Sequence, residues 1–440
     1  MPACRRRTAL GWGHVNGACW SIGTALTSGT LVVYLAIDLG AGSEHVSLLL
    51  AAPAVVGLLR LAAPLLIRVG GGPKRTCLAM LLTAYVLLLA LPAIGWAGQR
   101  LAHPVAALIA LLCVHQLFEY IGTVALWSWF ADVVPLRIRG RYFARRQVWQ
   151  LATLMPALWA SGAWVDHWKN THADAPLVAY FVMGGMGAGC LLLSLVPLAL
   201  MPESFGPLRR SPPVAFTWPS LVRPLADRNF RRLLAFGCWF SCFNGLTQSP
   251  QSIFPKSVLG IGLFTQSLMR TLMQGVQAGV SLLAGRLSDR YGNQPVLVAS
   301  QIVVACGPLF FLAASPAEPD WLFGAFFCWG AYAGINVCLP NLMLKLADPA
   351  DRSPYIACYF AVTSLCYAAA TVAGGYAFPW AARTWFPGSS ATLDLYRGCF
   401  FASWLLRTLG IVWLLRIREP GAWTWRPSLP PGARILATRQ

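Results

Sequence analysis

The chain consists mainly of long apolar stretches separated by short polar gaps. A helix needs about 20 apolar residues to cross a hydrocarbon core of about 30 Å, and each stretch is long enough to do so. The pattern therefore predicts an all-α polytopic membrane protein with twelve transmembrane helices. Their approximate ranges are 12–38, 45–69, 76–97, 103–131, 143–165, 176–201, 230–254, 264–288, 295–315, 321–346, 354–380 and 396–418.

The two parts of the chain repeat each other. The triplet Arg-Val-Gly at 68–70 follows the second segment, and Arg-Tyr-Gly at 290–292 follows the eighth. Pro, Arg and Tyr recur at similar spacing after the fourth and tenth segments, at Pro135, Arg139 and Tyr142 and at Pro349, Arg352 and Tyr355. Internal repeats of this size are typical of secondary transporters, whose substrate site lies between the repeats.

These repeats predict two pseudo-symmetric six-helix halves. The longest internal gap is rich in Pro and Arg and is predicted to be a cytoplasmic linker. The predicted organisation is an N-terminal half at 1–201, the linker at 202–229, a C-terminal half at 230–418 and a cytoplasmic tail at 419–440.

The distribution of Lys and Arg predicts the orientation. If the N-terminus is cytoplasmic, the inner gaps and tails carry 26 of the 34 basic residues and the outer gaps carry 5. Basic residues accumulate on the cytoplasmic side of membrane proteins. We therefore expect both termini in the cytoplasm. Because the abundance of Arg and Ala is typical of high-GC bacterial genes, we also expect a location in a bacterial inner membrane.

Composition narrows the function. The net charge is +19, but only 11% of the residues are charged and 57% are hydrophobic, which excludes a soluble enzyme or a disordered protein. The basic residues lie in short gaps between apolar segments, so nucleic acid is not an expected partner. The 13 cysteines lie mostly within apolar segments and form no C-x-x-C pair, so neither a metal site nor another cofactor is predicted.

A loop motif resembles that of a known family. The stretch G-R-L-S-D-R-Y-G-N at 285–293 is similar to the G-x-x-x-D-R-x-G-x-R-R motif of the major facilitator superfamily, without the final basic pair. The first-half copy is degenerate because Ile67 replaces the Asp. The resemblance implies alternating access and a cytoplasmic latch, with solvated topology charges as the alternative. The gating candidates are Gly285, Asp289, Arg290, Gly292, Arg68, Gly70, Arg139 and Arg352.

Glu119 is the most informative ionisable residue because it lies inside the fourth segment, one turn after His115. Burying a charge in a membrane is costly, so such residues usually face a cavity or a partner. A carboxylate beside an imidazole can exchange protons, which makes Glu119 and His115 candidates for proton coupling. The alternative is a structural ion pair between Glu119 and Arg60 of the second segment.

Three arginines lie within predicted helices, Arg60, Arg270 and Arg407. Arg60 and Arg270 are candidates for holding an anionic substrate, whereas Arg407 is expected to be structural because the resemblance makes the last helix peripheral. Polar and aromatic side chains on the presumed cavity helices suit an organic solute, although each one taken alone is more often a helix–helix contact. These further substrate candidates are Asn244, Gln248, Gln274, Tyr332, Asn336 and Tyr359.

The sequence thus predicts a secondary active transporter of a small organic solute, with protons and membrane lipids as further partners. It is expected to be a monomer and not an enzyme, because the motifs of P-loop, zinc-protease and serine-hydrolase sites are absent. Two alternatives stay open. One is a facilitator without ion coupling, and the other is a non-transporting sensor or scaffold with the same fold.

Overall fold

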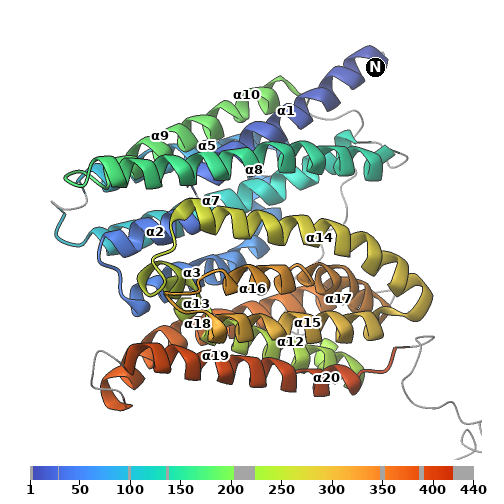
Figure 1. The fold of residues 1–440 in the computed structure, drawn as a ribbon. Helices are drawn as coiled ribbons and strands as arrows, with labels where there is room; N and C mark the ends of the chain where they lie inside the picture. The colour runs from blue at the N-terminus through green and yellow to red at the C-terminus, as the bar shows by residue number, and fades with distance from the viewer. Residues whose placement is uncertain are drawn as a thin grey trace, which may run out of the picture.

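A computed structural model describes the backbone of residues 3–27, 29–97, 101–134, 138–202, 223–346, 352–385 and 391–419. Within these ranges, some side chains lie outside the description, including Arg60, Arg68, Arg139 and Arg352. Most of the predicted linker, residues 203–222, and the predicted tail after residue 419 fall outside it. The described chain forms a bundle of long helices (Figure 1).

The N-terminal half contains the six predicted segments, several of them split into two consecutive helices. Breaks occur within the first, second, third and sixth segments. The elements are α1 (Ala3–Thr27), α2 (Thr30–Asp38), α3 (Ser43–Val56), the 3-10 helix η1 (Gly57–Ala62), α4 (Ala63–Val69), α5 (Pro73–Leu88), α6 (Ala90–Ala97), α7 (Pro104–Val133), α8 (Arg139–Thr171), α9 (Val178–Leu193) and α10 (Leu195–Leu200).

The C-terminal half repeats this arrangement. It begins with a short 3-10 turn, and the Asp227 side chain then caps the first helix by accepting the backbone N–H groups of Asn229 and Phe230. The elements are η4 (Arg223–Ala226), α12 (Arg228–Leu246), α13 (Gln248–Ser257), α14 (Leu263–Tyr291), α15 (Asn293–Ala313), α16 (Trp321–Trp329), α17 (Tyr332–Leu346), α18 (Arg352–Trp385), α19 (Ala391–Leu409) and α20 (Ile411–Leu415).

Each half has its own apolar core. The N-terminal core is centred on the fully buried rings of Tyr85, Trp129 and Tyr180 and draws nearly all its members from the first half. The C-terminal half holds two clusters, one around Phe230 and one around Phe254. Separate cores mean that the halves are packing units, which confirms the predicted twelve-helix arrangement in two halves.

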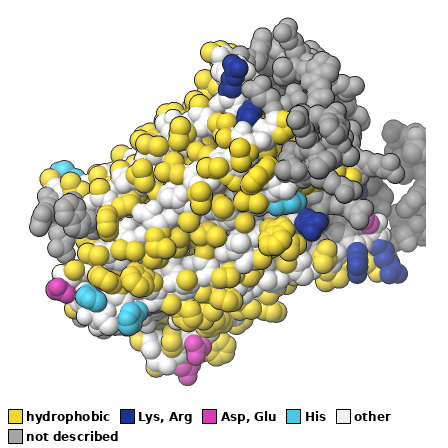
Figure 2. Space-filling model, turned by 90° about the horizontal axis from the view of Figure 1, so that it is seen from above, with side chains coloured by type: hydrophobic (Ala, Val, Ile, Leu, Met, Phe, Trp, Pro, Cys, Tyr) yellow, Lys and Arg dark blue, Asp and Glu magenta, His cyan; other side chains and the backbone are white. Residues whose placement is uncertain are grey.

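The outer surface is that of a membrane protein. Eight helical stretches among the described residues are long and apolar enough to span a bilayer, and the α3 stretch Ser43–Leu59 is apolar but shorter. Hydrophobic side chains cover most of the face in Figure 2, and charged side chains gather toward its edges. The remaining predicted segments, in α8, α12 to α13 and α14, carry more polar residues, and α8, α13 and α14 contact the opposite half.

Small residues bring the halves into close contact. A Cβ atom added to Gly162 of α8 would lie 2.7 Å from the Cα of Phe264 in α14. A Cβ at Gly375 of α18 would overlap the Ser47 side chain of α3. Both approaches lie toward the end of the bundle that carries the α2–α3, α8–α9 and α13–α14 turns, seen at the left in Figure 1. We call this end the closed end.

Candidate functional site

A cavity of about 420 Å³ lies between the two halves. Its walls come from the α1–α2 break, α12 to α14, α16, α17 and α19, and its size is that of a small-molecule site. We call it the central cavity. Its polar and aromatic lining includes Thr30, Tyr34, Asn244, Gln248, Gln251, Gln266, Arg270, Gln277, Trp329, Tyr332, Asn336 and Arg407.

Arg270 of α14 reaches across to the first half. Its Nη1 donates to the Thr30 hydroxyl at 2.7 Å, at the start of α2. Gly29 adopts a φ of 61° between α1 and α2, and a Cβ there would lie 2.5 Å from the same nitrogen. Glycine therefore meets two needs at this position, because it permits the left-handed backbone and leaves room for the guanidinium.

Arg407 of α19 enters the cavity from the opposite side. Its side chain is only 2% exposed, and its Nη2 donates to the Thr247 hydroxyl at 3.1 Å and to Gln251 Oε1 at 3.4 Å. Its Nε and Nη1 have no hydrogen-bond partner in the described part of the chain. The expectation that Arg407 is structural stays a prediction, and its side chain, which contacts Thr247 and Gln251, also lines the central cavity.

The amide and phenol groups of the cavity wall hold one another in place. The Tyr332 hydroxyl donates to Asn244 Oδ1 at 2.8 Å, and the Asn244 amide donates to the Phe240 carbonyl at 2.8 Å. This chain fixes two polar groups from α17 and α12 before any ligand arrives. A preorganised wall loses less conformational entropy on binding.

A second cavity, of about 200 Å³, adjoins the first and contains Glu119 and His115 of α7. We call it the Glu119 cavity. Gly29, Val33 and Leu50 line both cavities. The wall between them is therefore formed by the α1–α2 break and α3.

His115 and Glu119 bring an imidazole and a carboxylate together on one face of α7. His115 Nδ1 lies 3.0 Å from the Ala84 carbonyl, which can only accept, so this nitrogen carries a hydrogen. A neutral His115 then presents a lone pair on Nε2, which is 3.4 Å from Glu119 Oε2. Nε2 and Oε2 are thus two acceptor atoms that face each other on adjacent turns of α7.

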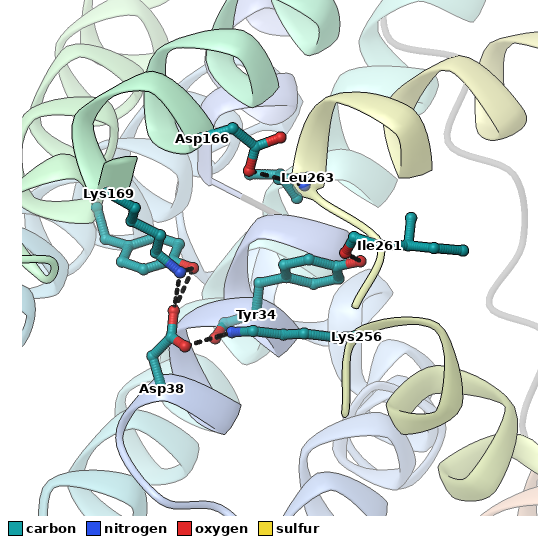
Figure 3. Close-up of polar contacts among 8 residues, drawn as sticks. Tyr34, Asp38, Asp166, Lys169, Lys256, Ile261 and Leu263 are labelled. Atoms are coloured by element: carbon teal, nitrogen blue, oxygen red, sulfur yellow. Dashed lines mark hydrogen bonds and ion pairs between the residues drawn. The ribbon is translucent and has the colours of Figure 1, made fainter. Parts of the chain in front are cut away.

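The closed end is held by charged residues that join the halves. Asp38, at the end of α2, accepts from Lys256 of α13 at 2.5 Å and also from Lys169 of α8 (Figure 3). The Tyr180 hydroxyl donates to the same carboxylate at 2.6 Å, and Lys256 also donates to the Tyr34 carbonyl at 2.7 Å. One carboxylate of α2 thus contacts α8, α9 and α13 and so connects four helices from both halves.

Asp166 makes a second connection at this end. Its two carboxylate oxygens accept the backbone N–H groups of Leu263 and Phe264 at 2.9 and 2.8 Å, as Figure 3 shows for Leu263. These are the first two residues of α14, whose terminal N–H groups lack partners within the helix. A side chain of the first half therefore caps a helix of the second.

The inner-loop motif lies at the opposite end. Gly292 has a φ of 94° and forms the sharp turn between α14 and α15, which explains this glycine. Asp289 and Arg290 are exposed, and Arg290 lies 5.2 Å from the Tyr291 ring centroid. Arg352, the predicted partner, lies outside the described side chains. The latch therefore stays a prediction.

Glu419 occupies the position beside this loop. Its buried carboxylate accepts from Asn293 Nδ2 at 2.8 Å, from the Gln294 backbone N–H at 2.7 Å and from Lys345 at 2.7 Å. Burial alone would raise the pKa of Glu419, but these donors outweigh it and hold the pKa below its usual range. Gln294, which stands at the first position of the usual basic pair, and its neighbour Asn293 thus bind Glu419, which follows the last helix.

The central cavity collects some of the predicted substrate residues and not others. Arg270, Asn244, Gln248, Tyr332 and Asn336 line it. Tyr359 is buried in the core of the second half against Gly237, and Gln274 is not part of the lining. Of the gating candidates on the first half, Gly70 closes the turn after α4 by a backbone bond to Leu66.

Sequence reasoning missed several functional positions. Gln251 and Gln266 lie on the cavity wall. Because both are polar residues within α13 and α14, the sequence could have indicated that they face a cavity. Asp38, Lys169 and Lys256 looked like ordinary charges at the ends of segments. The alternative predicted for Glu119, an ion pair with Arg60, stays a prediction because the Arg60 side chain lies outside the described residues.

Comparison with known families decides the family. The sequence pattern of the Major Facilitator Superfamily matches residues 15–370 and 249–437. The chain belongs to the major facilitator superfamily. The predicted resemblance is confirmed, and the protein is an integral membrane protein with the fold of this family's transporters. Comparison of the sequence with curated proteins gives no match.

Solved structures of transporters share this fold. A mutant form of the nucleoside transporter NupG matches with a TM-score of 0.70 and 12% identity, over 94% of this chain and 100% of that one. A bacterial homologue of the human lysosomal transporter Spinster, in an inward-facing and unoccupied conformation, matches with a TM-score of 0.65 and 11% identity, over 96% of this chain and 100% of that one. A D-xylose–proton symporter matches with a TM-score of 0.62 and 16% identity, over 94% of this chain and 98% of that one. At these identities the likeness concerns the fold alone.

Proposed function

We propose that the protein is a proton-coupled secondary transporter that moves a small organic solute by alternating access. The observation that carries the proposal is the pair of adjoining cavities. The central cavity lies between the halves and holds fixed polar groups, and the Glu119 cavity beside it contains a proton-binding pair. Residues common to both walls give the proton a route to influence the solute.

The proposed cycle follows from the contacts at the closed end. We propose that both termini lie in the cytoplasm of a bacterial inner membrane, and in that orientation the closed end faces outward. Opening to the outside requires the Asp38 contacts to Lys256 and the Asp166 cap on α14 to break. We propose that each monomer carries out this cycle on its own.

Proton coupling is assigned to Glu119 with His115 as its partner. A proton entering the pair removes the repulsion between the imidazole lone pair and the carboxylate. Moving one proton across 100 mV supplies about 2.3 kcal/mol, which supports roughly fifty-fold accumulation of a solute. The enzyme alternative has no support from the family, whose members named above are transporters.

The test is transport by the purified protein in liposomes with an imposed pH gradient. A solute is first identified by thermal stabilisation with a metabolite panel, and its uptake is then measured in radiolabelled form. We expect Glu119→Gln to lose accumulation against a gradient while keeping solute exchange, since the cavity is intact but the proton site is not. Glu318→Gln, an exposed glutamate in the α15–α16 turn, is the matched control.

Two results would favour the alternatives. Accumulation that never exceeds equilibrium in the wild-type protein, at any pH gradient, would indicate an uncoupled facilitator. Binding of a solute without any flux through well-sealed liposomes would contradict transport and indicate a sensor or scaffold.

A further inference from the structure

Two arginines from different helices face the central cavity without a carboxylate to balance them. Arg270 and Arg407 both line it, and neither takes part in an ion pair within the described part of the chain. Their hydrogen-bond partners are neutral: Thr30 for Arg270, and Thr247 and Gln251 for Arg407. The cavity therefore carries two positive charges in its walls.

Such an arrangement is costly unless a ligand completes it. A buried charge is normally paired, and an unpaired one destabilises the protein by several kcal/mol. Arg407 is 2% exposed and leaves Nε and Nη1 without acceptors. The N–H groups of these two nitrogens point to different sides of the guanidinium, so each can donate to an acceptor of its own. No carboxylate among the described residues accepts from either nitrogen.

We infer that the central cavity binds a small organic anion, with the carboxylate or phosphate group held between Arg407 and Arg270. This inference rests on the proposed function and names its substrate class. The rest of the solute lies against the Tyr34, Trp329 and Tyr332 rings and the Asn244, Gln248 and Gln251 amides. That lining suits a body with an unsaturated or aromatic part and a few hydrogen-bonding groups.

The position of the anion also gives it a conformational role. Arg270 belongs to the second half and contacts Thr30 and Gly29 of the first. Arg407 belongs to the second half and approaches from α19. An anion bound to both would neutralise the guanidinium that rests on the α1–α2 break, so the interaction between the halves would depend on occupancy.

The experiment measures thermal stability of the purified full-length protein with three probes at matched ionic strength in sodium chloride. The probes are inorganic phosphate, benzoate and benzamide, of which benzamide is the neutral analogue of benzoate. We expect saturable stabilisation by phosphate or benzoate and none by benzamide. A response to phosphate alone assigns the site to phosphate groups, and a response to benzoate alone assigns it to carboxylates.

Variants locate the effect. Arg407→Gln and Arg270→Gln should each weaken the anion response at least about tenfold, because each removes charge-assisted hydrogen bonds. Arg397→Gln, which changes an exposed arginine of the same helix α19, should leave it unchanged. If Arg407→Gln fails to fold, Arg407→Lys keeps the charge but loses the fork, and it should retain only part of the response.

Two results would overturn the assignment. One is equal stabilisation by benzamide and benzoate, or a response that survives in both arginine variants. The other is a folded wild-type protein that neither phosphate nor benzoate stabilises. A neutral solute that is transported while no anion binds would refute the anion and leave the transport function standing. An anion that binds through both arginines without ever being transported would refute the transport function and leave the anion site standing.

Discussion

Asp38 of the first half and Lys256 of the second form an ion pair of 2.5 Å across the interface between the halves. The same carboxylate binds Lys169, so removing its charge leaves two ammonium groups facing each other. In the proposed alternating access, this contact would exist only while this end is closed, because the two residues lie on helices of opposite halves.

Asp38→Asn should therefore shift the population toward the conformation open at this end. Losing a charged hydrogen bond corresponds to about 1.5–3 kcal/mol, or a shift of about tenfold or more. Double electron–electron resonance between non-natural spin-labelled residues at positions 172 and 318, one on each half, would report the separation. Asp174→Asn, an exposed aspartate at the same end, is the control. An unchanged distance distribution in Asp38→Asn would contradict the role of the pair.

Alkaline pH should favour the closed end rather than open it. Burial lowers the pKa of Lys256 to about 8, in spite of the neighbouring Asp38 carboxylate, whereas an exposed lysine has a pKa of about 10.4. Between pH 8 and about pH 10.4, closing this end therefore releases a proton from Lys256. The closed state thus gains stability as the pH rises through 8. The same resonance measurement should show a roughly tenfold gain in the closed population from pH 7 to pH 9.

Lys256→Met supplies the control for this pH effect. It removes the titrating group, so the dependence between pH 7 and 9 should disappear. If the closed population falls with rising pH in the wild-type protein, the ion pair with Asp38 dominates over the burial of Lys256, and the prediction is wrong.

Gly162→Ala should also disfavour the closed end. Its Cβ would lie 2.7 Å from the Cα of Phe264, a contact that only a backbone shift can relieve. Gly189→Ala on α9 is a matched control, because a Cβ there meets nothing within 4 Å. In a helix this control substitution should stabilise by up to about 1 kcal/mol. Equal behaviour of the two variants in melting and spin-label distances would refute the importance of the close approach.

Glu419→Gln should destabilise the second half. The change removes the charge that accepts from Lys345, Asn293 and the Gln294 backbone, at a cost of about 1–3 kcal/mol. Because the folded pKa of Glu419 lies below its usual value near 4.5, the contribution is complete above pH 4.5 and is lost as the pH falls below it. Thermal melts at pH 7 and pH 4 should therefore differ less in the variant. Asp394→Asn, at an exposed aspartate, should melt like the wild type.

The sequence was sufficient for the fold and for the His115–Glu119 pair, and both depend on local patterns. Apolar length defines the helices, and a separation of four residues places the imidazole beside the carboxylate on one helix face. The central cavity depends on contacts between distant segments. Arg407 meets Gln251 from 156 positions away, and nothing in the local sequence of α19 distinguishes it from a structural arginine.

The contacts at the closed end could not be predicted from the sequence for a related reason. Asp38 and Lys256 are 218 positions apart and lie at segment ends, where charges are ordinary. Only the way the two halves meet makes them partners. The same holds for Tyr359, which a helical pattern assigns to the cavity but which the packing of α12 against α18 places in the core.

The wall shared by the two cavities has a thermodynamic consequence. Gly29, Val33 and Leu50 border both the proposed anion site and the proposed proton site, so an occupant of one would change the energy of binding at the other. Linkage is reciprocal: if protonation of Glu119 strengthens anion binding by some factor, the anion strengthens proton binding by that same factor. Proton uptake upon addition of the anion can be titrated in detergent, without any transport. That titration would therefore measure the coupling energy between proton binding and anion binding across the α1–α2 break.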